Sequence, residues 1–442
     1  MISLSVSGFV PPAWLVIPFA FLLLLIATGP LFFAHFWHKY YKHIAVSLGL
    51  LVGIYYLTVF HQAFPVIETV AEYVSFISLL FALYVAAGGI YIFADFESKA
   101  ITNVLFLLMG AVLTNIIGTT GASVLLIRPY MRINRYRLKP YHIVFFIFFV
   151  SNLGGLLTPI GDPPLFMGFL KGVPFFWTTT HLIWPWIVAL LLLTFIFILL
   201  EKNNTQLDEV DVSAHYTNSI IINGKRNFVW LGLIILTVFM DPMVIDGFPC
   251  LEVAGKKISY IRELLQLGIA LACLRFAKKS AMQSNEFSFE PILEVAFLFV
   301  GIFLTMIPAL QLLEHYGSSL GNISPGMVYF GSGVFSAVLD NAPTYVNFFA
   351  LVMSVFQLSV SNVQDVHAFI SGEQAIYLMA ISVGSVFWGA MTYIGNGPNF
   401  MVKAIAENAG VKMPPFFQYI YKYSLPFLLP VLVVIWLIFF FK

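Results

Sequence analysis

Charge is scarce in this 442-residue sequence, since only 10% of its residues are Asp, Glu, Lys or Arg. Soluble domains have about 25% charged residues, so the composition excludes an ordinary soluble protein. The two cysteines, Cys250 and Cys273, are too few for a disulfide framework or a cysteine-based metal site. The net charge of +1 gives no basic surface for a nucleic acid, and we expect no such partner.

Catalytic motifs are also missing from the sequence. It contains no set of nucleophile and base residues and no zinc motif. The segment "GTTG" at 118–121 has no following lysine, so it does not predict a nucleotide-binding loop. We therefore expect no enzymatic activity, no cofactor and no metal other than a transported ion.

Long apolar runs dominate what is present, and 60% of the residues are hydrophobic. Runs such as 13–33 and 425–441 are long enough to cross a hydrocarbon core of about 30 Å as helices. The sequence predicts an all-α polytopic protein in a lipid bilayer, with about ten transmembrane helices. The predicted spans are 13–35, 43–60, 66–96, 141–170, 182–200, 228–247, 259–277, 291–312, 373–405 and 420–441.

Two further apolar segments, 101–128 and 325–357, have polar midpoints, which predicts re-entrant hairpins. With both hairpins returning to their starting side, 17 of the 22 Lys and Arg residues fall on one side of the membrane. The positive-inside rule makes the side with these basic loops cytoplasmic and places both termini outside. The densest basic run, 128–140, is either a topology anchor or a site for anionic lipid.

The two halves of the sequence, 1–226 and 227–442, resemble each other weakly. The recurring segments, in the same order, are "PVIE" (65–68) with "PILE" (291–294), "AVLTN" (111–115) with "AVLDN" (337–341), "SNLGGLLTPIGDPPLF" (151–166) with "SVFWGAMTYIGNGPNF" (385–400), and "VPFFW" (173–177) with "PPFFQY" (414–419). In the predicted layout the two copies run in opposite directions. Inverted repeats are typical of secondary transporters, whose substrate lies near the membrane midplane between the repeats.

Helix-breaking residues interrupt one predicted span in each half. They form "NLGGLLTPIGDPP" (152–164) within span 141–170 and "TYIGNGPNF" (392–400) within span 373–405. Because lipid satisfies no backbone polar group, such breaks are tolerated only where protein or water covers them. The sequence therefore predicts two broken helices, whose free carbonyls can hold a cation and whose free N–H groups can hold an anion.

Two carboxylates lie in these segments, Asp162 in the first break and Asp340 at the tip of the second hairpin. Because an Asp in the membrane costs about 2.5–3.5 kcal/mol on insertion scales, both suggest ion binding. The alternative is that an Asp caps a half-helix, for example Asp162 before Pro163. Other polar side chains can complete the site or instead satisfy broken backbone; they are Thr114, Asn115, Thr119, Thr120, Asn152, Thr158, Asn341, Thr344, Thr392, Asn396 and Asn399.

Three segments, 151–166, "TNIIGTTGAS" (114–123) and "SAVLDNAPTYVNFF" (336–349), resemble those of the ion transporter superfamily. This superfamily includes sodium/proton antiporters, arsenite exporters, citrate–metal transporters and sodium-coupled dicarboxylate transporters. The sequence is similar to a bacterial branch that carries the labels sodium/proton antiporter and citrate transporter. The resemblance implies a scaffold domain and a transport domain that moves as an elevator, within a homodimer in the bacterial inner membrane.

The hairpin tips depart from the Ser-Asn-Thr motif with which the dicarboxylate branch binds sodium and carboxylate. The tips here read Thr114-Asn115 with Thr119-Thr120, and Asp340-Asn341 with Thr344. An ionised Asp340 would repel a citrate-like anion unless a cation lay between them. We therefore expect Na⁺/H⁺ antiport by alternating access, with Asp340 and Asp162 as the coupled carboxylates. The alternative is Na⁺- or H⁺-coupled transport of a di- or tricarboxylate such as citrate.

Overall fold

The computed structural model describes residues 9–202, 204, 216–242, 244–245, 247–254 and 256–441. Every predicted crossing contains a helix: α1 (Ile17–Phe32), α2 (Ala34–Thr58), α3 (Phe64–Gly88), α5 (Pro140–Phe149) with α6 (Pro163–Leu170), α7 (Trp177–Glu201), α8 (Arg226–Val238), α9 (Ile261–Phe276), α11 (Glu290–Tyr316), α15 (Ala375–Trp388) with α16 (Gly397–Asn408), and α17 (Phe416–Tyr419), which runs through the π-helical segment Ile420–Leu428 into α18 (Leu429–Phe439). This confirms the predicted all-α polytopic class.

By length and composition, seven helices of the described part could cross a membrane, or eight if the bent pair Val363–Ser371 and Ala375–Met391 is one span. One of the seven, Ala100–Ile133, is broken at Gly118 and is described below as a hairpin. Helices α2, α8 and α9 fall outside this set. α8 and α9 have only 13 and 16 residues, and α2 starts with a polar run rich in His and Lys. A helix of about 20 residues is needed to span the full hydrocarbon core.

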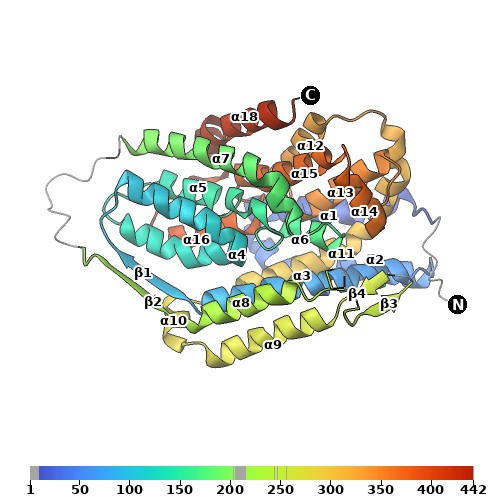
Figure 1. Ribbon diagram of the computed structural model, residues 1–442, viewed down its shortest axis with the longest axis horizontal. Coiled ribbons are helices and arrows are strands. Elements are labelled where there is room, and N and C mark those ends of the chain that lie inside the picture. Colours follow the sequence, from blue (N-terminus) through green and yellow to red (C-terminus); the bar gives the residue numbers. More distant parts are fainter. Residues whose placement is uncertain are drawn as a thin grey trace.

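Two short antiparallel ribbons lie at opposite ends of the molecule (Figure 1). β1 (Tyr91–Asp95) pairs with β2 (Ser219–Asn223), and β3 (Leu251–Val253) pairs with β4 (Lys256–Ile258). We call the two ends of the molecule the β1 end and the β3 end. The prediction of one continuous span over 66–96 was wrong after Gly88, because the chain there leaves the helix and forms β1.

The helices form two groups, which Figure 1 shows above and below its centre. Helices α2, α3, α8, α9 and α11 pack together, and we call them the flanking bundle. Helix α1 packs on α2 and α11. The other long helices, with α12 (Pro325–Val338) and α13 (Asn341–Val355), surround the two breaks, and we call them the hairpin bundle. Short helices α10 (Lys279–Ser284) and α14 (Val363–Ser371) lie at the β1 end and the β3 end, respectively.

Both predicted hairpins are present. Helix α4 (Ala100–Ile133) breaks at Gly118, whose φ of 77° lies in the left-handed region that glycine tolerates. Its two arms fold back on each other, so that the rings of Phe106 and Tyr130 lie 5.3 Å apart. Helices α12 and α13 form the second hairpin, in which the Phe335 and Phe348 rings lie 5.9 Å apart.

The first helices of the two repeats run in opposite directions side by side. On α3 and α11, the Tyr73 hydroxyl donates to the carbonyl of Ala296 at 2.9 Å, and the Tyr84 hydroxyl donates to the carbonyl of Ser288 at 2.9 Å. Residue numbers therefore rise along α3 as they fall along α11. This antiparallel pair has the geometry expected of an inverted repeat.

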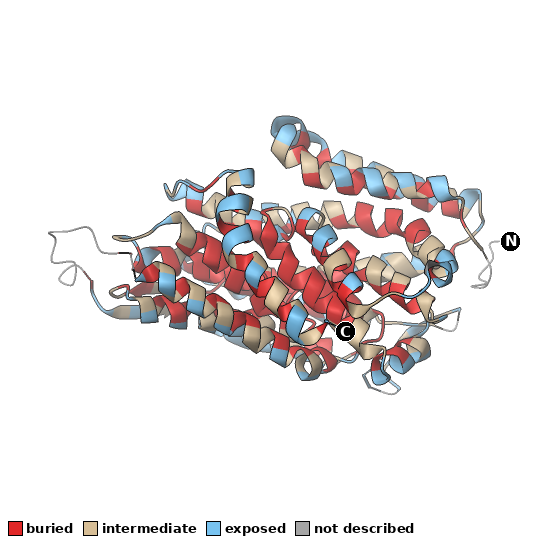
Figure 2. Ribbon diagram, turned by 90° about the horizontal axis from the view of Figure 1, so that it is seen from above, coloured by how far each residue is buried: buried red, intermediate tan, exposed pale blue. Residues whose placement is uncertain are grey.

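The main core of buried apolar side chains runs through both bundles, and its most deeply buried helix lies in the hairpin bundle. Residues 142–149 of α5 are at most 1% exposed, so this helix is surrounded by protein on every side. Figure 2 shows buried positions concentrated in the interior helices and exposed positions on the outer ribbons. Large apolar side chains such as Leu51, Phe195 and Leu271 are more than half exposed, as expected for a surface that faces lipid.

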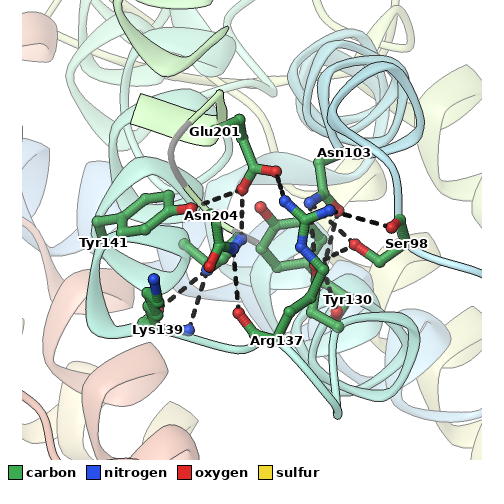
Figure 3. A network of polar contacts seen from close by, with 10 residues as sticks. Ser98, Asn103, Tyr130, Arg137, Lys139, Tyr141, Glu201 and Asn204 are labelled. Atoms are coloured by element: carbon green, nitrogen blue, oxygen red, sulfur yellow. Dashed lines mark hydrogen bonds and ion pairs between the residues drawn. The ribbon is translucent and has the colours of Figure 1, made fainter. Parts of the chain in front are cut away.

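The basic run 128–140 is held largely by contacts within the protein. Arg128 pairs with Glu286 at 2.7 Å, and Arg137 pairs with the buried Glu201 at the end of α7. Figure 3 shows the network around Glu201, which also accepts a hydrogen bond of 2.7 Å from the Tyr141 hydroxyl. Beside it, Asn103 and Asn134 close the base of the first hairpin through hydrogen bonds of 2.8 Å. These contacts favour an anchoring role for the run.

Candidate functional site

The carboxylate of Asp162 lies where the two hairpins and the two breaks meet. Its Oδ1 accepts from the Thr119 hydroxyl at 2.8 Å and from the Asn396 amide at 3.0 Å. Its Oδ2 accepts from the Asn341 amide at 2.6 Å. Asp162 is 1% exposed, and all three donors are neutral. A single acidic group thus joins segments from both halves of the chain without a basic partner among these contacts.

Four half-helices begin around this carboxylate. They start after Gly118 in α4, after Asp162 in α6, after Asp340 in α13 and after Asn396 in α16. Each helix start carries a partial positive charge of roughly +0.5, so together the four starts contribute about +2. This positive potential explains how an Asp whose described hydrogen-bond partners are all neutral is accommodated here.

The side chain of Asp162 does not cap its own helix, although the residue occupies the N-cap position of α6. The cap alternative describes Asp340 instead, because its Oδ1 accepts from the backbone N–H of Ala342 at 3.0 Å at the start of α13. Asp340 also lines a cavity of about 350 Å³. The two carboxylates therefore have different surroundings.

This cavity, which we call the site cavity, lies between the hairpin bundle and the flanking bundle. From the hairpin bundle it is lined by Gly118, Thr119, Thr120, Gly161, Asp340, Asn396 and Gly397 among others. On the side of the flanking bundle, the cavity is lined by Trp37, His38, Glu290 and Glu294, which lie in the first turns of α2 and α11 at the β1 end. No Lys or Arg is among its described lining residues. The cavity therefore joins the site to the β1 end.

The two breaks have matching internal geometry. In the first, the N–H of Gly161 donates to the Thr158 hydroxyl at 3.1 Å, and in the second the N–H of Gly395 donates to the Thr392 hydroxyl at 3.1 Å. The hydroxyls in turn donate to the carbonyls of Asn115 and Ala337, both at 2.6 Å. Thr158 and Thr392 thus hold the unwound chain against the hairpins.

Several other predicted site residues satisfy broken backbone. Asn115 donates to the carbonyl of Gly154 at 2.7 Å and accepts from the N–H of Leu157 at 2.8 Å. Thr114 donates to the carbonyl of Val150 at 3.1 Å, and Thr344 donates to that of Asp340 at 2.9 Å. These contacts favour the structural alternative for Thr114, Asn115 and Thr344.

An amide pair links the two breaks next to Asp162. The Asn152 amide donates to Asn399 Oδ1 at 2.7 Å, and Asn399 donates to the carbonyls of Gly389 and Thr392 at 2.8 and 2.9 Å. The Oδ1 atoms of Asn152 and Asn341 are buried and have no hydrogen-bond partner among the described residues. Both amide oxygens are therefore free to accept, and that of Asn341 lies beside the carboxylate of Asp162.

The sequence reasoning missed several residues of the site. The hydroxyls of Ser123 and Ser151 lie 2.8 Å apart, and the carbonyl of Ser151 accepts from Asn396 at 3.0 Å. Ser151 is identical to its repeat partner Ser385, so the repeat alignment held a signal for it. His38 and Glu290 carried no comparable signal, because they belong to no recurring break or hairpin.

A family model described as "Putative citrate transport" matches residues 10–440, which is nearly the whole chain. No curated protein matches the chain in a sequence comparison. The match confirms the resemblance to the citrate branch of the ion transporter superfamily. It also agrees with a multi-pass membrane protein that acts as a secondary transporter.

Proposed function

The chain belongs to this citrate-transport family, and we propose that it carries a small di- or tricarboxylate of the citrate type together with a coupling cation, Na⁺ or H⁺, by alternating access. One observation carries the proposal most: four half-helix starts converge on Asp162 beside a cavity open to one end of the molecule. Helix starts favour anions, which suits a carboxylate substrate.

The site cavity has the size of a small-molecule site. Ligand pockets enclose about 300–1,000 Å³, and the site cavity has about 350 Å³. Its glycine-rich edges, at 118–121 and 395–397, bring backbone close to this space. We infer that the substrate carboxylates bind to backbone N–H groups of these edges other than those of Thr119 and Gly395, which already donate to the Gly161 carbonyl and the Thr392 hydroxyl, since no Lys or Arg is present among the described lining residues.

A coupling cation is required by the charges. When ionised, Asp162 and Asp340 carry two negative charges, which cancel the partial positive charges of the helix starts and repel an anion. The free Oδ1 atom of Asn341 lies close to Asp162, because the Nδ2 of the same amide donates to this carboxylate. Oxygen ligands of this kind suit a hard cation such as Na⁺, and a proton on Asp162 would serve the same purpose. A bound cation would let the anion approach.

Na⁺/H⁺ antiport without an organic substrate is the second candidate. It is favoured by the neutral donors around Asp162, since the described residues that hydrogen-bond to it include no basic group and such a carboxylate can exchange Na⁺ for H⁺. Both candidates place the cation on the same side chain. They differ in whether the site cavity must also hold a carboxylate.

Transport in proteoliposomes separates the candidates. A Na⁺ gradient is imposed without organic anion while internal pH is recorded, and labelled citrate or succinate is then added. We expect labelled carboxylate uptake that depends on the Na⁺ or H⁺ gradient, and little proton flux before the addition. Proton flux that runs at full rate without carboxylate and vanishes in Asp340→Asn would instead establish the antiporter.

The remaining proposals concern the setting of the transporter. We propose that it lies in a bacterial inner membrane as a homodimer, with the basic loops of the β1 end in the cytoplasm. The site cavity would then face the cytoplasm, and the hairpin bundle would move against the flanking bundle as an elevator. Cross-linking of purified protein in liposomes would test the dimer, which a monomer at all protein concentrations would contradict.

A further inference from the structure

A second cavity, of about 870 Å³, lies at the β3 end, and we call it the β3 cavity. Like the site cavity, it lies between the two bundles. The flanking bundle lines it with the first turns of α3 and the start of α9, and the hairpin bundle lines it with the end of α6 and the loop that follows. The interface between the bundles is therefore hollowed at both ends of the molecule.

A wall of packed side chains separates the two cavities along both helices that line them. On α3, Ser75 lines the β3 cavity and Leu80 lines the site cavity, which corresponds to a rise of about 7.5 Å. On α6, Pro163 lines the site cavity and Phe169 lines the β3 cavity, a rise of about 9 Å. The residues between these positions line neither cavity, so the two cavities are not continuous along these helices.

Four phenylalanine rings form the centre of this wall, and we call them the aromatic plug. The ring of Phe76 on α3 lies 6.3 Å from that of Phe166 on α6, 4.8 Å from that of Phe299 and 5.7 Å from that of Phe303, both on α11. All four residues are at most 6% exposed. Phe166 follows Asp162 by about one helical turn in the direction of the β3 cavity. The aromatic plug therefore lies directly beyond the site, on its β3 side.

A buried ion pair joins the bundles on the β3 side of the aromatic plug. Lys171, which follows α6 in the hairpin bundle, pairs at 2.6 Å with Glu72 of α3 in the flanking bundle. Their side chains are 6% and 14% exposed, and both residues line the β3 cavity. Because a buried charge is costly without its partner, the pair opposes separation of the bundles at this end.

The other ion pairs of the β3 cavity stay on the side of the flanking bundle. Lys256 of β4 pairs with Glu68 of α3, and Arg262 of α9 pairs with Asp241 and Glu263. These carboxylates offset the basic groups, so the β3 cavity has no excess of positive charge that would favour an anion. Such pairs can stay intact when the bundles move relative to each other, whereas the pair of Lys171 with Glu72 cannot.

We propose that the β3 cavity is the second vestibule of the transport path, and that the aromatic plug and the Lys171–Glu72 pair form the closed gate between it and the site. This inference rests on the proposed function for its premise of alternating access. In this structure the site opens to the β1 end through the site cavity and is closed toward the β3 end. Opening of the β3 end requires Phe166 to leave Phe76 and Lys171 to leave Glu72. Water that enters the β3 cavity would solvate the two separated charges, which keeps the gate reversible.

A reversible cross-link tests the gate. In Lys171→Cys/Glu72→Cys, on a Cys250→Ser background, a short bis-methanethiosulfonate reagent ties the bundles together and a reductant releases them. Both charges are removed, so no unpaired charge is left behind. We expect citrate uptake into proteoliposomes to fall about tenfold when about 90% of the protein is linked, because a linked molecule cannot open its β3 end, and to recover with reductant. Uptake at the unlinked rate would overturn the proposal.

The Lys256–Glu68 pair provides a matched control. It lines the same cavity, but both of its residues lie on the side of the flanking bundle. Cross-linking of Lys256→Cys/Glu68→Cys should therefore leave uptake unchanged, and an equal loss of uptake in this control would count against a gate. Because the site cavity stays open to the β1 end, the protein linked between positions 171 and 72 should still bind labelled citrate at equilibrium in detergent. Loss of this binding would also argue against a gate confined to the β3 end.

A second linked pair tests the aromatic plug and keeps the proposal falsifiable if Lys171→Cys/Glu72→Cys does not fold. In Phe76→Cys/Phe166→Cys, the same reagent should block uptake reversibly, because the two rings are in contact across the bundles in this structure. Unchanged uptake by this linked variant would overturn the assignment of the plug.

The outcomes keep the gate separate from the proposed function. A protein that takes up no citrate, but whose Na⁺-driven proton flux is blocked by the 171–72 cross-link, would support the gate and overturn carboxylate transport. Gradient-driven citrate uptake that persists in every cross-linked variant would support carboxylate transport and overturn the gate.

Discussion

The substitutions Asp162→Asn and Asp162→Ala distinguish the role of Asp162 in folding from the role of its charge in ion binding. In Asp162→Ala, the Thr119 hydroxyl and the amides of Asn341 and Asn396 lose their acceptor. An unsatisfied buried donor costs about 1–3 kcal/mol, so the three together cost about 3–9 kcal/mol. We expect this variant to be severely destabilised or not to fold.

Asp162→Asn should behave differently, because its carbonyl oxygen can still accept from Thr119 and Asn396 and only one donor is left without a partner. The new carbonyl oxygen takes the position of Oδ1, and the new NH₂ group faces Asn341. A flip of the Asn341 amide would let its oxygen accept from that NH₂ group, but it would move the NH₂ group of Asn341 to a buried position where Oδ1 has no partner among the described residues. We therefore expect a loss of stability of about 1–3 kcal/mol, the cost of one unsatisfied buried donor, which is well below that of Asp162→Ala.

Thermal unfolding in detergent measures both variants, with and without Na⁺. A cation that binds only the folded state adds about 2.7 kcal/mol at 100 times its Kd. We expect the wild type to be stabilised by Na⁺, or by low pH if H⁺ is the coupling ion, and Asp162→Asn to be insensitive to both. If Asp162→Ala is as stable as Asp162→Asn, or if Asp162→Asn retains the cation effect, the reasoning about this carboxylate is refuted.

Three further changes test other parts of the structure. Asp340→Asn keeps an N-cap side chain at α13 and removes the charge that lines the site cavity, so we expect near wild-type stability with weaker cation dependence of uptake. Asp340→Ala should lose about 1 kcal/mol more stability than Asp340→Asn, and equal stability of the two variants would argue against the cap. Gly161→Ala would place a Cβ 2.2 Å from the carbonyl oxygen of Gly155 and should abolish folding or transport. In the control Gly232→Ala, the new Cβ on α8 meets nothing within 4 Å and should be tolerated. Wild-type uptake by Gly161→Ala would contradict the close packing of the break. At the β1 end, burial alone would raise the pKa of Asp95, but hydrogen bonds from Thr217 and Arg135 outweigh burial and lower this pKa. The ionised Asp95 therefore stabilises the fold fully above the ordinary pKa of about 3.9, and this stabilisation is lost as pH falls through the pKa of Asp95 in the folded protein. Asp95→Asn should flatten the acid side of the stability–pH profile, and an unchanged profile would contradict this.

The hairpins and broken helices could be predicted from the sequence because their polar and helix-breaking residues differ from the apolar residues on both sides. Helix breakers and polar residues inside an apolar run, such as 152–164, cannot be covered by lipid, so their position near the centre of the protein follows from physics alone. The repeat alignment then matched Asn396 to Asp162, at the equivalent position of the second break. The structure brings Asp162, Thr119, Asn341 and Asn396 together as this reasoning required.

The different surroundings of the two carboxylates could not be predicted. Asp162 and Asp340 both precede a half-helix, and only side-chain geometry shows that Asp340 caps its helix while Asp162 turns to the opposite repeat. The end of α3 could not be predicted from the sequence either. An apolar run such as 89–96 fits the end of a helix or a strand equally well until its partner, β2, is known.

Binding of labelled carboxylate at equilibrium is the most direct test of a site in which an anion and a cation share the space around Asp162. Affinity for citrate or succinate would be measured on purified protein at increasing Na⁺ concentration and at several pH values, for the wild type and Asp162→Asn. Because linkage is reciprocal, we expect the cation to tighten carboxylate binding in the wild type and to have no such effect in Asp162→Asn. Carboxylate affinity that is the same with and without cation in the wild type, or the absence of carboxylate binding under every condition, would contradict the coupled site.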